Sequence, residues 1–206
     1  MSFRLLAVDT TAEHGSIALT AGGRLLEEVP LNAPDGFGHI LFGEIECLLR
    51  RHALTLADLD GFASASGPGS FTGVRVGLTA VKGFAEATGQ KVVAVSNLQA
   101  LAWFGTHALR AVVMDARRGE VYGAVYDASL RLVCDEVVMP HADWIKTLPP
   151  GDLEVITQGD PQRSLAGAIA SIAQAQFAAG LAKDPAEIDA NYVRRSDAEL
   201  LWREPH

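Results

Sequence analysis

The chain repeats one order of expected strands and helices, and this duplication restricts the possible folds more than any other feature of the sequence. In the first half, apolar periodicity and turn residues favour the order strand, strand, strand, helix, strand, helix, strand, helix, at residues 3–8, 16–19, 24–29, 39–52, 61–65, 70–88, 91–95 and 97–106. The second half repeats this order in shortened form, with strands and helices at residues 110–114, 120–126, 130–138, 143–147, 153–157 and 163–178. Asp9 and Asp115 each follow the first strand of a copy, so they hold the same place in the repeated unit.

This order also predicts how the strands pair. Three strands that follow one another closely favour an antiparallel meander, whereas the later alternation of strands and helices requires parallel pairing. We therefore expect an α/β protein with the ribonuclease-H-like fold of actin-like ATPases, built as two tandem lobes. The first lobe is expected over residues 1–106, and a second, reduced lobe over residues 107–206.

Composition narrows the classes of function. The 206 residues are 49% apolar and 20% charged, which is a globular balance, and no apolar run reaches the ~18 residues that span a bilayer. Asp9 comes too early for the apolar stretch of a signal peptide, so a cytoplasmic protein is expected. The net charge of -8 opposes independent, non-specific binding to nucleic acid, which needs a cationic surface.

The turns after the two equivalent strands are candidate phosphate loops. Asp9, Thr10 and Thr11 fit a turn in which a carboxylate organises a cation while hydroxyls and amides hold phosphate oxygens. The alternative is a turn in which Asp9 caps backbone amides. The matching turn runs from Asp115 to Gly119 and contains the bulky Arg117 and Arg118 where a phosphate loop favours small residues. The arginines could pair with phosphate, with nearby carboxylates or with a partner protein, and we interpret this second turn as a degenerate site.

The most distinctive motif is SGPGSFTGVRVG, at residues 66–77. Gly67, Pro68 and Gly69 form a tight turn, and Ser70 is a good N-cap for the helix that follows. The start of that helix could bind an anion, yet the motif lacks the Lys-Ser/Thr pair of a Walker A loop. Gly73, Gly77 and Ala80 form a stripe of small residues, for which we favour a packing role: it would let a neighbouring helix approach closely.

Metal and thiol chemistry have little support in the sequence. The two cysteines, Cys47 and Cys134, are not part of a CxxC motif, and none of the six histidines has a second histidine four residues away. We therefore expect no metal site, no catalytic residues and no cofactor belonging to this chain alone.

Several motifs, in order along almost the whole chain, resemble the TsaB family, also called YeaZ. They are LLAVDTT, GPGSFTGVRVG, VAVSNLQALA, MDARRGEVYGAVY and the closing NYVRR, of which the second is the most specific. The resemblance implies a non-catalytic subunit that pairs with a TsaD-like protein, which carries the metal and the transfer chemistry, and with a TsaE-like ATPase. The product would be N6-threonylcarbamoyladenosine at position 37 of tRNAs that read codons starting with A. A nucleotide at an inter-subunit site is a further possibility that the resemblance leaves open.

The resemblance also implies an interface. The family pairs through the first two long helices of the first lobe, both in the complex with TsaD and in a homodimer. Here we expect that surface to contain Leu41, Ile45, Leu48, Gly73, Gly77 and Ala80. The alternative is that both helices are buried within their own lobe. Two other functions stay open: a glycoprotease-like metallopeptidase or ATPase of the same fold, and a homodimer that acts outside tRNA modification.

Overall fold

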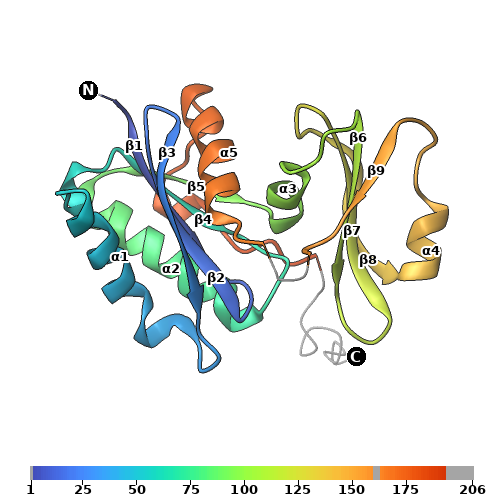
Figure 1. Ribbon diagram of the computed structural model, residues 1–206, viewed down its shortest axis with the longest axis horizontal. Coiled ribbons are helices and arrows are strands. Elements are labelled where there is room, and N and C mark those ends of the chain that lie inside the picture. The colour runs from blue at the N-terminus through green and yellow to red at the C-terminus, as the bar shows by residue number, and fades with distance from the viewer. Residues whose placement is uncertain (1, 160–162, 194–206) are drawn as a thin grey trace, which may run out of the picture.

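The computed structural model describes residues 2–159 and 163–193, which form two β-sheets with helices around them (Figure 1). The first sheet has the strand order β3-β2-β1-β4-β5. Its strands are β1 (Arg4–Asp9), β2 (His14–Ala21), β3 (Arg24–Asn32), β4 (Gly61–Ala65) and β5 (Lys91–Val95). The first three pair antiparallel, while β4 pairs parallel with β1 and with β5. The meander and the parallel extension are both as the sequence predicts.

The second sheet is a reduced copy of the first. Its order is β8-β7-β6-β9, with β6 (Leu109–Asp115), β7 (Glu120–Asp127) and β8 (Leu132–Pro140) antiparallel and β9 (Leu153–Ile156) parallel to β6. The short helix α4 (His141–Lys146) lies between β8 and β9 in the chain. The predicted duplication and the actin-like ATPase fold, with a smaller second lobe, are therefore confirmed.

Helices cover the two faces of the first sheet. Successive side chains of a strand point to opposite faces, so Leu6 and Val8 of β1 pack with α1 (Leu41–Arg51) and α2 (Phe71–Thr88). Leu5 and Ala7 point the other way and pack with α5 (Ala166–Ala178). Figure 1 shows α1 and α2 on one side of the sheet and α5 on the other.

The position of α5 differs from the expectation. The sequence order assigns residues 163–178 to the second lobe, but α5 packs across β1, β2, β4 and β5 of the first sheet. Its first amides find acceptors there: Ser16 Oγ accepts from Leu165 N at 3.2 Å and from Ala166 N at 3.0 Å, and Glu28 Oε1 accepts from Gly167 N at 2.8 Å. The chain thus crosses back after β9, and the first lobe includes segments from both ends of the sequence.

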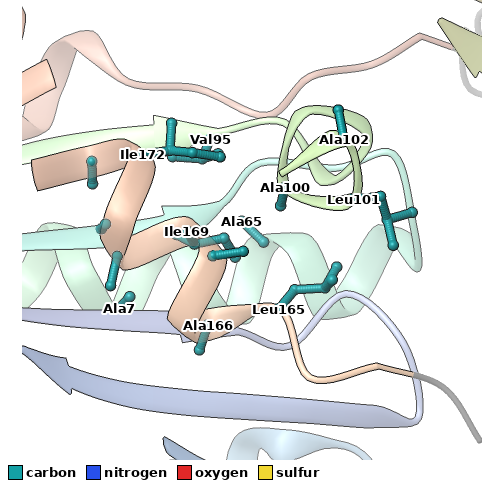
Figure 2. Packing of buried hydrophobic residues seen from close by; sticks show 14 of the residues in the cluster. Ala7, Ala65, Val95, Ala100, Leu101, Ala102, Leu165, Ala166, Ile169 and Ile172 are labelled. Atoms are coloured by element: carbon teal, nitrogen blue, oxygen red, sulfur yellow. The ribbon is translucent and has the colours of Figure 1, made fainter. Parts of the chain in front are cut away.

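One short helix makes the contact between the two sheets. The helix α3 (Asn97–Ala102) packs against α5 and also against β6 and β7 of the second sheet. Figure 2 shows Ala166 and Ile169 of α5 beside Ala7 and Ala65, with Ala100 of α3 close by. Because these residues are mostly alanine, α5 can lie close to the strands of the first sheet, while α3 makes the contact with the second sheet.

The chain then continues along the first lobe to the end of the described part. Lys183 forms an antiparallel bridge with Val92 at the edge of β5, and the 3-10 helix η3 (Pro185–Glu187) follows. Two further 3-10 helices, η1 (Phe37–His39) and η2 (Leu56–Asp58), flank α1. Within the described residues, no helix is long and apolar enough to cross a bilayer.

Candidate functional site

The first candidate phosphate turn, residues 9–11, is buried. Asp9, Thr10 and Thr11 are each 3% exposed or less. The Asp9 carboxylate accepts two hydrogen bonds from Thr11 on the same oxygen, from the backbone N–H at 3.0 Å and from the hydroxyl at 2.6 Å. This geometry is the alternative that the sequence leaves open, in which Asp9 caps its own turn.

Both threonine hydroxyls are used inside the chain. Thr10 Oγ1 donates to the carbonyl oxygen of Gly73 at 2.7 Å, and Thr11 Oγ1 donates to Asp9 while it accepts from Asn97 Nδ2 at 2.6 Å. The carbonyl oxygen of Thr11 accepts from Ser70 N at 2.6 Å. The donors that would hold a phosphate in an actin-like ATPase are therefore directed at the protein itself.

The glycines of the motif explain how the start of α2 lies so close to the first turn. A Cβ atom on Gly69 would lie 2.5 Å from the carbonyl oxygen of Thr11, and one on Gly73 only 2.0 Å from that of Thr10. A Cβ on Gly77 would lie 2.6 Å from Thr10 Oγ1. The sequence suggests that this stripe admits a neighbouring helix, but Gly73 and Gly77 face the chain's own first turn instead.

The motif loop, residues 66–70, is held from a second side by Asn97. The side chain of Asn97 accepts from Gly67 N at 2.9 Å, and its backbone N–H donates to Gly67 O at 2.9 Å. Gly67 has a φ of 101°, which favours glycine, and the Gly67–Pro68 peptide bond is cis. Ser70 caps α2 as expected, with its hydroxyl accepting from Gly73 N at 3.3 Å. Asn97 was absent from the expected site, although it lies in the segment VAVSNLQALA that supported the family resemblance.

The surroundings of Asp9 disfavour its charged form. Burial raises the pKa of the Asp9 carboxyl above its usual range, and the nearby Glu28 carboxylate acts in the same direction. The hydrogen bonds from Thr11 and Asn97 oppose this shift of the pKa without cancelling it. The raised pKa is therefore a consequence of the same burial that closes the first turn.

The second turn, residues 115–119, has a different geometry. Asp115 is exposed and accepts from Arg117 N at 2.7 Å. Arg117, Arg118 and Gly119 have φ values of 64°, 57° and 78°. The two arginines thus adopt a left-handed backbone conformation that is unfavourable for residues other than glycine. Beside them lies a cavity of about 610 Å³ lined by Asp115, Gly119, His141, Thr157 and Gly159 among others. The second turn is therefore open where the first is filled.

Arg117 and Arg118 are exposed, and within the described residues neither makes an ion pair. By contrast, Arg50 pairs with Glu46 at 3.8 Å and Arg51 pairs with Glu27 at 2.7 Å. The third arginine pair of the sequence, Arg194 and Arg195, lies outside the described residues. Among the described residues, Arg117 and Arg118 are thus two adjacent guanidinium groups that lie exposed at the second turn without an ion pair.

The structure corrects the expectation that six residues of α1 and α2 lie at an interface. Leu41, Ile45 and Leu48 are at most 2% exposed and belong to the core under α1. Gly73 and Gly77 are buried against the first turn, and Ala80 is 5% exposed at the floor of a groove. The helical spacing correctly grouped these residues on common faces, but the faces point mostly into the lobe.

The outer faces of the same helices nevertheless form an apolar groove. The α1–α2 groove has a volume of about 550 Å³ and is lined by Phe42, Phe71, Arg75, Val76, Ala80 and Phe84 among others. Phe42 of α1 is 57% exposed and Phe71 of α2 is 46% exposed, whereas most phenylalanine side chains in folded proteins are buried. The apolar groove on α1 and α2 is therefore formed largely by residues other than the six expected ones.

The described residues include no group of three or more His, Cys, Asp or Glu side chains placed to hold a metal ion. The two cysteines are unpaired and far from either turn in sequence. The geometry of the described part thus consists of a closed first turn, an open second turn with two arginines, and an apolar groove on the outer helices.

Comparisons with known proteins point to one family. The family model for TsaD, "tRNA N6-adenosine threonylcarbamoyltransferase", matches residues 28–197. The protein named TsaB of Bacillus subtilis is 33% identical over 162 residues, covering 75% of this chain and 70% of the relative. The TsaB protein of Escherichia coli is 35% identical over 127 residues, which is 60% of this chain and 54% of that protein. The solved structure of YeaZ from Pseudomonas aeruginosa aligns with a TM-score of 0.78 at 30% identity, over 91% of this chain and all of that one (100%).

Proposed function

Because this chain belongs to the TsaB (YeaZ) family, we propose that it is the non-catalytic partner of a TsaD-like subunit in the formation of N6-threonylcarbamoyladenosine in tRNA. The modified base is proposed to be at position 37 of tRNAs that read codons starting with A. The TsaD-like subunit would perform the transfer, and a TsaE-like ATPase would join the pair in the cytoplasm.

The observation that carries the non-catalytic role is the closed first turn. An actin-like ATPase uses hydroxyls and amides at this turn to hold phosphate oxygens. Here Thr10 donates to Gly73 O, Thr11 donates to Asp9, and the glycines of α2 leave no room between helix and turn. A phosphate group would have to displace the protein's own carbonyl oxygens, which repel anions. These contacts support a structural role for the first lobe rather than a nucleotide-binding one.

The α1–α2 groove supports the partner role. Exposed phenylalanines in a groove of about 550 Å³ are costly for an isolated protein and favourable once a partner covers them. We propose that the groove receives the TsaD-like subunit in the complex and a second copy of this chain in its absence. One surface would then serve two competing pairings.

The proposal gives the chain no cofactor of its own and assigns any nucleotide to a site between subunits. It also makes tRNA contact a property of the complex, because the net charge of -8 disfavours binding by this chain alone. Arg117 and Arg118, exposed and without an ion pair in the described part of the chain, are proposed to touch a phosphate within that complex.

The test is co-purification of the tagged chain with the TsaD-like protein of its host, followed by an assay of tRNA modification with and without the chain. We expect a stable complex and a modification activity that depends on both subunits. The isolated chain should hold no stoichiometric zinc or iron by metal analysis. Turnover of ATP or a peptide by the isolated chain at ~1 s⁻¹ or faster, in the range of ordinary enzymes, would instead support an ATPase or metallopeptidase.

A further inference from the structure

The residues that close the described chain lie against the motif loop. Asn191 N donates to Ser66 O at 2.7 Å. The carbonyl oxygen of Asn191 lies 3.2 Å from the point that a Cβ on Gly67 would occupy. Asn191 and Tyr192 begin the sequence NYVRR, to which the proposed function above assigns no role. Their backbone is thus placed beside the loop that also holds the start of α2.

The side chain of Asn191 reaches the second lobe. Its Nδ2 donates to Glu136 Oε2, on β8. The other oxygen of the same carboxylate accepts from the Tyr126 hydroxyl, at 2.5 Å, and from the hydroxyl of Ser96, the N-cap of α3. Three donors from three segments therefore converge on Glu136, at the wall of an inter-lobe cavity of about 580 Å³.

The chemistry of the groups at positions 191 and 136 fixes which of them donates and which accepts. Burial and the neighbouring Glu136 carboxylate raise the pKa of Tyr126, so the phenol stays protonated and donates a hydrogen bond to that carboxylate. The amide nitrogen of Asn191 can only donate, and a carboxylate can only accept. The arrangement therefore specifies an amide at position 191 opposite an acceptor at position 136.

Tyr192 extends the edge of the α1–α2 groove. Its ring centroid lies 5.7 Å from that of Phe71, and its hydroxyl accepts from Arg75 Nε at 3.2 Å. The Arg75 guanidinium in turn lies 3.6 Å above the Phe71 ring. Phe71 and Arg75 both line the groove, and Tyr192 is 46% exposed beside them. Tyrosine and arginine are, with tryptophan, the residue types enriched among those that dominate binding energy at interfaces.

We propose that Tyr192 contacts the TsaD-like partner at the edge of the α1–α2 groove, and that Asn191, bonded to Glu136 of the second lobe, is the residue that positions it. This inference rests on the proposed function. It gives the second lobe a part in shaping a surface of the first lobe, because Glu136 holds the segment that carries Tyr192.

The test uses a donor–acceptor exchange. Asn191→Asp sets a carboxylate against Glu136 and breaks the contact, whereas the double variant Asn191→Asp with Glu136→Gln restores one donor and one acceptor. In the double variant, the new amide at position 136 can still accept from Ser96 and Tyr126 through its oxygen, while its nitrogen donates to the new carboxylate at position 191. Titrating the TsaD-like subunit against the full chain, we expect Asn191→Asp and Tyr192→Ala to weaken binding about tenfold or more, and the double variant to bind within about threefold of the wild type.

Two further measurements keep the result interpretable. Trp103→Ala removes another exposed aromatic side chain, outside the groove, and should leave binding unchanged. Hydrogen exchange on the chain alone reports the Asn191 amide, which should lose protection in Asn191→Asp and regain it in the double variant. Wild-type affinity in both Asn191→Asp and Tyr192→Ala would overturn the inference. If the wild-type chain fails to bind at all, the proposed function falls together with the partner contact, while unchanged exchange in Asn191→Asp overturns the positioning role by itself.

Discussion

The hydroxyl of Thr10 donates a hydrogen bond of 2.7 Å to the carbonyl oxygen of Gly73, a residue 63 positions later in the chain. This contact joins the turn after β1 to the first turn of α2. It occupies the hydroxyl that would otherwise face a phosphate, and it requires a residue without a side chain at position 73. The contact therefore links the specific motif of the family to the closed first turn, on which the proposed non-catalytic role rests.

Gly73→Ala should destabilise the protein severely. The added methyl group would lie 2.0 Å from the Thr10 carbonyl oxygen, and backbone atoms on both sides must move to relieve the clash. Overpacking of this kind costs roughly 3 kcal/mol of the free energy of unfolding. Gly83→Ala is the matched control, because Gly83 lies in the same helix with nothing within 4 Å of the new Cβ. This change should raise the free energy of unfolding by about 0.5–1 kcal/mol. Urea unfolding of both variants decides the matter, and equal stabilities would contradict the close approach.

Asp9→Asn should raise stability at neutral pH relative to the wild type. Burial raises the pKa of Asp9 in the folded protein, so folding favours its neutral form, and this contribution is lost as pH rises through the folded-state pKa. Asparagine keeps an acceptor for Thr11 and carries no charge. The difference in the free energy of unfolding between variant and wild type should therefore be larger at about pH 7.5 than at about pH 4. A difference that is the same at both pH values would show that folding does not raise the pKa of Asp9.

The sequence predicts most of the elements because they depend on local patterns. The strand at Gly61–Ala65 and the helix that starts after Ser70 and ends before Gly89 follow from apolar runs and capping residues. The duplication of Asp9 and Asp115 follows from the order of these elements. Each of these features is decided within a few residues of the chain.

Contacts between distant segments could not be derived in the same way. The spacing of Gly73 and Gly77 shows that they share a face of α2, but whether that face meets a partner or the turn at Thr10 depends on where β1 lies. The Ala-rich helix α5 is apolar on most sides, so its sequence does not select between the two sheets. Its place on the first sheet depends on acceptors at Ser16 and Glu28, about 140 to 150 residues earlier.

Phe42→Asp should abolish both pairings of the chain without unfolding it. Phe42 is 57% exposed at the α1–α2 groove, so a carboxylate there is solvated in the free chain but would be buried against an apolar partner. We expect the homodimer and the complex with the TsaD-like subunit to weaken together, each by at least about tenfold. Leu25→Asp, at an apolar position on β3 that is 47% exposed, is the control. Sedimentation of each variant, alone and with the partner, gives the result. If Phe42→Asp keeps both pairings, the interface lies elsewhere.

The isolated chain should bind tRNA no more tightly than the non-specific range of roughly 10⁻⁴ to 10⁻⁶ M at physiological salt. Within the complex, changing Arg117 and Arg118 to Glu should lower tRNA affinity while the subunits stay together, because both side chains are exposed at the second turn. Arg50→Glu, at a residue that already pairs with Glu46, is the control and should have little effect. A titration of labelled tRNA measures the affinity of the isolated chain and of the complexes that carry either change. Saturable nanomolar binding by the chain alone would make it an RNA-recognition module in its own right.

The most direct measurement is the threonylcarbamoyladenosine content of tRNA from cells depleted of this chain and supplied with defined variants. Depletion should lower the modification. The wild type and Asp9→Asn should restore it, since neither a charged Asp9 nor nucleotide chemistry at the first turn is needed, whereas Phe42→Asp should not. Unchanged modification after depletion, or full restoration by Phe42→Asp together with failure of Asp9→Asn, would contradict the role of a non-catalytic partner that acts through the α1–α2 groove.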